Sequence, residues 1–176
     1  MLDLMFSGML LFGSNEGSMH LPEGIASALL ASHSGMRYLV IILMLAAIFF
    51  AYQTSKGKRP FAGSTKKTGM FTMILIDIQL LMGALMYFFF LASQTNFKLG
   101  KLKDQLEVGM FRSIAIDHFI GMLIAIALVH IGYAKAKKAL DEQEAGRKQF
   151  LFYLIAFIII MLVIPWPFMH PERGWM

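Results

Sequence analysis

Four blocks of apolar residues, separated by short polar stretches, dominate the pattern of this sequence. They cover about residues 35–52, 68–91, 112–133 and 149–166. A helix needs roughly 20 apolar residues to cross a bilayer, so each block is long enough, the last with some tilt. The pattern therefore predicts an all-α protein, an integral membrane four-helix bundle with up-and-down topology.

The chain before the first block is predicted to be an interfacial segment and helix entry, residues 1–34. Pro22 suits the first turn of a helix and Glu23 follows it, so we expect a helix that begins there and continues into the first span. The bundle itself would cover residues 35–166. A proline-rich stretch then ends the last helix and leaves residues 167–176 as a C-terminal tail.

Basic residues are concentrated in the first and third connections between the blocks. Cytoplasmic loops of membrane proteins carry an excess of Lys and Arg, so these two connections are expected inside and both termini on the periplasmic side. The middle connection is also basic, though less so. The basic residues of the first and third connections are Lys56, Lys58, Arg59, Lys66, Lys67, Lys135, Lys137, Lys138, Arg147 and Lys148.

The composition agrees with a membrane protein and excludes several other classes. Of 176 residues, 57% are hydrophobic and 15% charged, and the mean hydropathy is +0.63. Cysteine is absent, which excludes disulfides, thiolate metal sites and covalent c-type haem attachment. The net charge of +5 is explained by the loops. The first expected partner is therefore the lipid bilayer, and no nucleic acid is expected.

Two histidines at the outer ends of the first and third helices are the leading candidates for a site. His33 lies at the entry of the first helix, and His118 lies deeper in the third. Two neutral imidazoles from different helices are the usual way to hold a b-type haem without covalent attachment. Gly83, Gly121 and Ala125 would leave room for a flat macrocycle, although small residues also favour close helix packing. We expect one haem b, with its iron between His33 and His118.

Three further residues are predicted to line this cofactor. Arg37 and Arg112 lie near the outer ends of the first and third helices. There a guanidinium group can pair with a haem propionate or simply anchor the helix at the interface. Gln79 lies on the second helix, four residues before Gly83.

His130, Asp77 and Asp117 are the other ionisable groups of note inside the predicted spans. His130 follows His118 by twelve residues, which puts it near the inner end of the helix and on a different face. Because no second inner histidine exists, we expect a packing or interfacial role for it and a single haem. The two aspartates can orient a ligand histidine, relay a proton, or pair with Lys or Arg, and the sequence does not choose among these roles.

Several motifs resemble a family of small bacterial four-helix membrane proteins described as cytochrome B-like and common in Bacteroidetes. They are HSGMRYLV, DIQLLMGALMY, DHFIGMLIAIALVHIGYAKAKKA and IPWPF with a terminal RGW, and the resemblance covers about residues 32–175. Many members have Glu-His-Pro where this chain has Asp-His-Phe, so the carboxylate is kept but the proline is not. The resemblance implies a bacterial inner (cytoplasmic) membrane protein with recurring positions at His33, Arg37, Gln79, His118 and the turn Pro165, Trp166 and Pro167.

The leading functional hypothesis is electron transfer between quinones or periplasmic carriers and a respiratory partner. A cofactor-free accessory subunit of a larger respiratory or secretion complex is the alternative, because small-residue faces also suit packing against other membrane helices. No nucleotide-binding glycine motif or nucleophile constellation indicates a stand-alone enzyme. Weaker alternatives are a proton or solute channel through Asp77, Gln79 and Asp117, and a copper or zinc site at His20, His33, His118 and His170.

Overall fold

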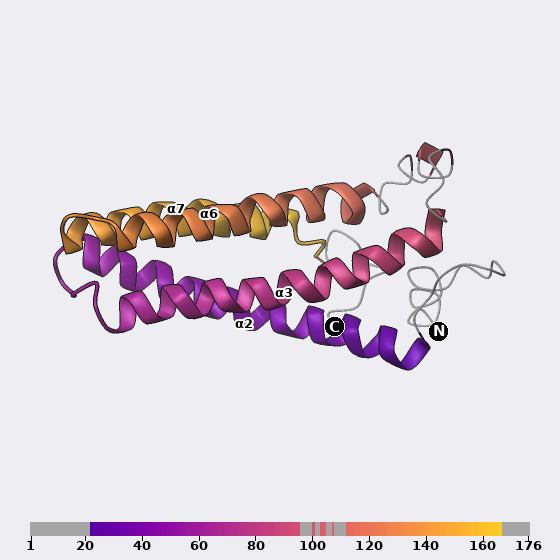
Figure 1. Ribbon diagram of the computed structural model, residues 1–176, viewed down its shortest axis with the longest axis horizontal. Coiled ribbons are helices and arrows are strands. Elements are labelled where there is room, and N and C mark those ends of the chain that lie inside the picture. The colour runs from indigo at the N-terminus through magenta and orange to yellow at the C-terminus, as the bar shows by residue number, and fades with distance from the viewer. Residues whose placement is uncertain (1–21, 96–99, 101–102, 105–106, 108–111, 167–176) are drawn as a thin grey trace. The chain divides into compact units, whose positions relative to one another are not determined.

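The computed structural model describes residues 22–95, 100, 103, 104, 107 and 112–166. In this part of the chain four helices are long and apolar enough to cross a membrane, with mean hydropathy between 1.8 and 2.1 (Figure 1). The predicted all-helical class is therefore confirmed. Residues 1–21 and the tail 167–176 lie outside the described residues. The elements are α2 (Glu23–Ser55), α3 (Ser64–Thr95), the π-helix η1 (Ser113–His118), α6 (Phe119–Lys137) and α7 (Glu142–Val163).

Helix α2 begins where the sequence predicted, directly after Pro22. The backbone N–H groups of Ile25 and Ala26 both donate to the carbonyl of Pro22, at 3.0 Å. The helix has 33 residues, or about 50 Å at 1.5 Å per residue, which exceeds the roughly 30 Å of a hydrocarbon core. His33 and Arg37 thus lie on one continuous helix that is longer than a membrane span.

Helix α7 begins earlier than the predicted start at residue 149. The Asp141 side chain accepts a hydrogen bond from the backbone N–H of Glu144 at 2.7 Å, and the Glu144 carboxylate accepts one from the N–H of Leu140 at 3.0 Å. This reciprocal capping stabilises a polar first turn that hydropathy alone does not detect. The helix ends at Val163, two residues before Pro165, as the proline-rich stretch predicted.

Most of the surface of each apolar helix faces outward. Only 22% to 28% of each candidate span is buried inside the protein. Large apolar side chains such as Ile42, Leu81 and Leu162 are 63%, 71% and 72% exposed. Faces of this kind are stable in an apolar solvent, which supports contact with a lipid bilayer.

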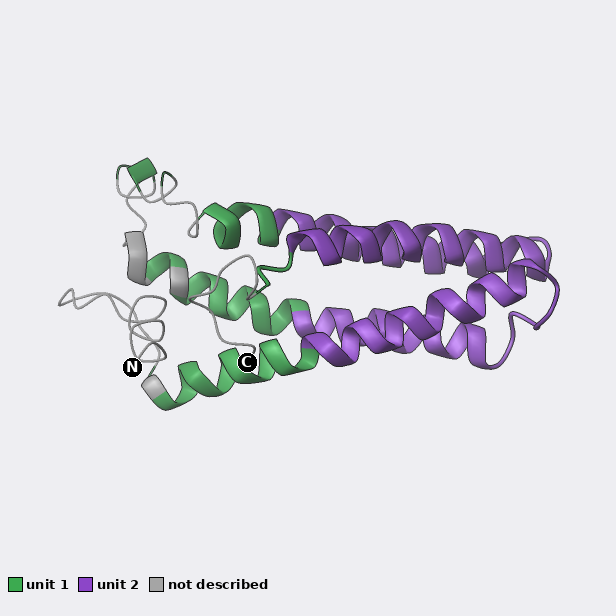
Figure 2. Cartoon of the chain, turned by 180° about the vertical axis from the view of Figure 1, so that it is seen from behind, with its two compact units in different colours: residues 1–36, 80–119, 164–176 green, residues 37–79, 120–163 purple. Residues whose placement is uncertain are grey.

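The chain divides into two compact units (Figure 2). Unit 1 comprises Met1–Met36, Leu80–Phe119 and Ile164–Met176. Unit 2 comprises Arg37–Gln79 and Ile120–Val163. The boundary passes through α2 and α3, so each of these two helices contributes residues to both units.

Small residues allow the helices of unit 2 to pack closely. A Cβ atom at Gly146 would lie 2.5 Å from the backbone nitrogen of Ser55, so α7 and α2 touch almost backbone to backbone. A Cβ atom at Gly121 would lie 2.5 Å from the Val163 side chain. The sequence offered two roles for Gly121, space for a macrocycle or close helix packing. In the structure this glycine packs α6 on α7.

A cluster of polar side chains joins three helices inside unit 2. The hydroxyls of Thr54 and Thr65 lie 3.0 Å apart, and the Gln149 amide donates to the carbonyl of Thr65 at 3.3 Å. The Tyr153 hydroxyl donates to the carbonyl of Gly69 at 2.9 Å. Hydrogen bonds of this kind satisfy polar groups that are buried between the helices, and so hold the helices together.

The two strongly basic connections lie at the same end of unit 2. Residues of both connections line one cavity of about 720 Å³, among them Lys58, Arg59, Asp141 and Glu142. In the first connection Gly57 and Gly63 have φ values of 70° and 81°, which a glycine adopts without strain. Their shared end agrees with the prediction that both connections face the same side of the membrane.

Candidate functional site

The structure brings His33 and His118 together inside unit 1. His33 projects from α2 and His118 is the last residue of η1, and both side chains are half-buried. Their imidazole centroids lie 6.3 Å apart and the ring planes are inclined by 79°. The two histidines that the sequence singled out are therefore neighbours, although 85 positions of the chain separate them.

The spacing of these imidazoles fits two ligands on one metal. A ligating imidazole nitrogen lies about 2.0 Å from a first-row metal and about 1.1 Å from its own ring centroid. Two imidazoles on opposite sides of one metal would therefore have centroids about 6.2 Å apart. The centroid distance of 6.3 Å is close to this value, so the two imidazoles would be near enough to share one metal.

Gly83 on α3 provides space for the imidazole of His33. A Cβ atom at this position would lie 3.0 Å from Cε1 of His33 and 3.6 Å from its Nδ1. The imidazole thus lies directly against the backbone of α3, where a larger side chain would displace it. This glycine, which the sequence associated with thin helix faces, is part of the site itself.

The turn that carries His118 is an irregular segment of helix. Residues Ser113–His118 form a π-helix, and the α-helix α6 continues from Phe119. Single π-helical turns are rare and occur often at functional sites, because the extra residue re-aims the side chains that follow.

Tyr87 of α3 fixes this π-helical turn at two points. Its hydroxyl donates a hydrogen bond to the carbonyl of Ala115 at 3.1 Å. Its ring stacks on that of Phe119, with centroids 4.2 Å apart and planes inclined by 7°. The two contacts lie on either side of His118 in the chain. Tyr87 is a positioning residue that sequence reasoning missed, because an interfacial tyrosine is common and only the fold reveals its partners.

The three other predicted site residues have different surroundings. Arg112 is exposed and directly precedes η1 in unit 1. Arg37 belongs to unit 2, where its guanidinium donates to the Tyr38 hydroxyl at 3.1 Å and lies 4.8 Å from that ring centroid. Gln79, also in unit 2, is buried with 5% of its surface exposed. The structure does not place Arg37 and Gln79 relative to the paired histidines.

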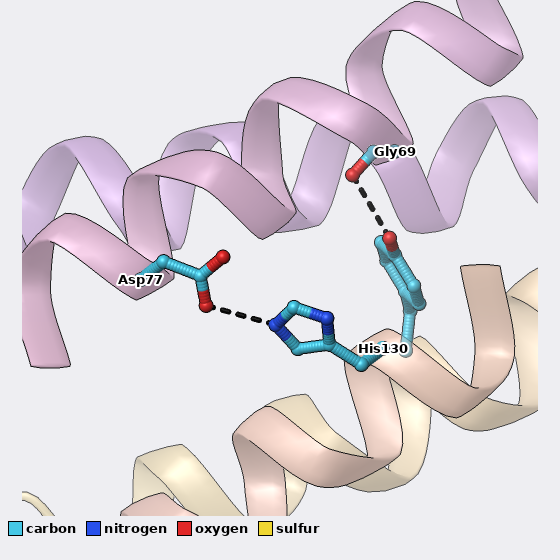
Figure 3. A network of polar contacts seen from close by, with 4 residues as sticks. Gly69, Asp77 and His130 are labelled. Carbon is cyan, nitrogen blue, oxygen red and sulfur yellow. Dashed lines mark hydrogen bonds and ion pairs between the residues drawn. The ribbon is translucent and has the colours of Figure 1, made fainter. Parts of the chain in front are cut away.

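His130 and Asp77 form an ion pair that the sequence did not predict (Figure 3). His130 Nε2 lies 2.8 Å from Asp77 Oδ1, between α6 and α3 of unit 2. The sequence offered Lys or Arg as charged partners of Asp77, and a packing or interfacial role for His130. A usable signal was present, since two ionisable groups at membrane depth on successive antiparallel helices each need a polar partner.

Asp117 belongs to neither of these two pairs. Asp117 is exposed on η1. His20 and His170, which the copper or zinc alternative needed, lie outside the described residues.

No protein-family model, curated protein or solved structure matches this chain.

Proposed function

We propose that this protein is a membrane b-type cytochrome that transfers electrons, with one haem b held between His33 and His118. The observation that carries the proposal is the pairing of the two imidazoles, whose centroids lie 6.3 Å apart, because two imidazoles from different helices would hold a haem without covalent attachment. The proposal includes membership of the cytochrome B-like family, a place in the bacterial inner membrane with both termini periplasmic, and a respiratory partner complex.

If His33 and His118 both held a haem, that group would supply one-electron exchange, which favours electron transfer over catalysis. The residues of this chain have distinct tasks around it. His33 and His118 supply the ligand nitrogens, and Gly83 leaves the space for the ring of His33. Tyr87 holds the turn that carries His118.

Three polar residues, Arg112, Arg37 and Gln79, are proposed to line the haem. Arg112, exposed beside η1, is the proposed partner of a haem propionate, because guanidinium and carboxylate groups form paired hydrogen bonds. Arg37 and Gln79 are proposed to line the same cofactor on the strength of the sequence alone.

The test is a dithionite-reduced minus oxidised absorbance spectrum of the purified full-length protein, with pyridine haemochrome quantification. We expect about one haem b per chain, and we expect His33→Ala and His118→Ala each to remove most of it. His130→Ala is the matched control, because it removes an imidazole from α6 outside the pair, and it should retain the haem.

Two results would contradict the proposal. One is the absence of Soret and alpha bands from protein produced with an adequate supply of haem. The other is an unchanged haem content in both ligand variants. Without haem, an accessory subunit of a larger respiratory or secretion complex becomes the better interpretation, and metal analysis of the same sample tests the copper or zinc alternative.

A further inference from the structure

The ion pair between Asp77 and His130 lies within the apolar part of the helices. Asp77 is at the middle of the candidate span Ser64–Phe89. His130 is seven residues before the end of the span Ser113–Lys137, or about 10 Å along the axis. A phosphate headgroup stays at the membrane interface, so a ligand that meets Asp77 must itself dissolve in hydrocarbon.

Both side chains of the pair are also open to the outside of the protein. The exposed fractions are 44% for His130 and 42% for Asp77. One turn away on α3, Ile74 and Leu81 are 43% and 71% exposed, and Ala134 on α6 is exposed as well. Because an ionisable group that faces hydrocarbon costs several kcal/mol, a polar pair on an apolar face indicates a functional site.

The hydrogen bond inside the pair leaves further polar atoms for a ligand. His130 Nε2 and Asp77 Oδ1 share one hydrogen bond (Figure 3). None of the described residues bonds His130 Nδ1 or Asp77 Oδ2. A carboxylate that accepts a proton from one ring nitrogen fixes the histidine tautomer and leaves the other nitrogen as an acceptor. The pair is thus prepared to receive a hydroxyl proton or, once protonated, to donate to a carbonyl oxygen.

The matching ligand must dissolve in the bilayer and carry an oxygen that alternates between hydroxyl and carbonyl. We propose that the Asp77–His130 pair binds the oxygen of the head group of a membrane quinone or quinol. The biological role of this site rests on the proposed cytochrome function, since a quinol would be the membrane-soluble electron donor of the haem. The binding itself requires no haem and is tested separately.

The test uses a fluorophore beside the pair, because the chain contains no cysteine. A bimane label on Ala134→Cys, one turn after His130, is titrated with menaquinone-4 in the purified full-length protein. Quinones quench such labels on contact. We expect saturable quenching, and a binding constant at least about tenfold weaker in Asp77→Asn and in His130→Gln, because each loses a charge-assisted hydrogen bond.

A label on Leu162→Cys is the matched control. Leu162 is 72% exposed on α7, so its label reports quinone that is merely dissolved around the protein. We expect its quenching to rise linearly without saturation and to be the same in all variants. Polar replacements of half-exposed residues preserve shape, and far-ultraviolet circular dichroism confirms that each variant remains helical.

The outcomes separate this inference from the proposed haem. Saturable quenching that depends on Asp77 and His130 supports the quinone site, whether or not the preparation contains haem. Haem with linear quenching at Ala134, or with saturation unchanged in the variants, overturns the quinone site and leaves the cytochrome standing. A wild-type dimer that the variants convert to a monomer also overturns it, because a second copy would then cover the pair.

Discussion

Two pairs that include histidine lie in the two units of this molecule, and they are built differently. In unit 1 two imidazoles lie with their centroids 6.3 Å apart and their planes inclined by 79°. One lies against Gly83 and the other ends a π-helical turn. In unit 2 one imidazole is bonded to a carboxylate at 2.8 Å. Two imidazoles form a donor set for a metal, whereas a carboxylate fixes an imidazole for proton exchange. A histidine therefore suits metal binding when its neighbour is another imidazole, and proton exchange when its neighbour is a carboxylate.

The largest expected effect comes from filling the space beside His33. Gly83→Leu should remove nearly all bound haem, because even an alanine Cβ would lie 3.0 Å from Cε1 of His33. Gly83→Ala should weaken haem affinity by about tenfold or less, and haem occupancy should fall only in part. Gly35→Ala, on α2 where a Cβ atom meets nothing within 4 Å, is the control. Equal haem content in all three variants would show that His33 does not need this position.

Replacing one imidazole with a thioether sharpens the comparison between the pairs. His33→Met should keep a haem with mixed His and Met ligation and raise its reduction potential by on the order of 100 mV. His130→Met should leave the potential unchanged, since its partner is a carboxylate. Potentiometric titration of the alpha band measures both, and a shift in the His130 variant would disprove the division of roles.

A smaller effect is expected from the tyrosine that holds the π-helical turn. Tyr87→Phe removes the hydrogen bond to the carbonyl of Ala115, at a cost of about 1 kcal/mol, and should weaken haem binding by at most about fivefold. Tyr153→Phe removes a similar bond to the carbonyl of Gly69 in unit 2. It should cost similar stability without changing haem affinity. Haem titration and chemical unfolding of both variants separate a positioning role from a purely structural one.

The smallest effect concerns the stability of the unit 2 ion pair. A double-mutant cycle of Asp77→Ala and His130→Ala should give a coupling free energy of unfolding of about 0.6 kcal/mol, typical of polar contacts between membrane helices. Neither variant should change haem content. A coupling of several kcal/mol, measured by unfolding in mixed micelles, would assign the pair a mainly structural role and weaken its assignment as a ligand site.

The hydropathy pattern was sufficient to predict which residues form the helices and that these helices suit a lipid bilayer. Four apolar blocks predict four membrane helices because hydrocarbon satisfies no backbone hydrogen bond and leaves the helix as the stable form. Pro22 similarly marks the start of α2, since a proline at a helix start loses no hydrogen bond. These are local properties, so the sequence alone is sufficient. The early start of α7 was missed because it depends on reciprocal side-chain capping at Asp141 and Glu144 and not on hydropathy.

The tertiary structure decided which polar groups meet. The sequence identified His33 and His118 as candidates, because charged or ligating groups at membrane depth are costly and therefore informative. It did not reveal Gly83 under His33, the contacts of Tyr87, or the pairing of Asp77 with His130. Those contacts depend on the register between neighbouring helices, which the sequence of a single helix does not determine. Inside unit 2, Gly121, Gly132 and Gly146 allow close packing between helices. In each pair, the two members meet because of packing between helices and not because of a local preference of the chain.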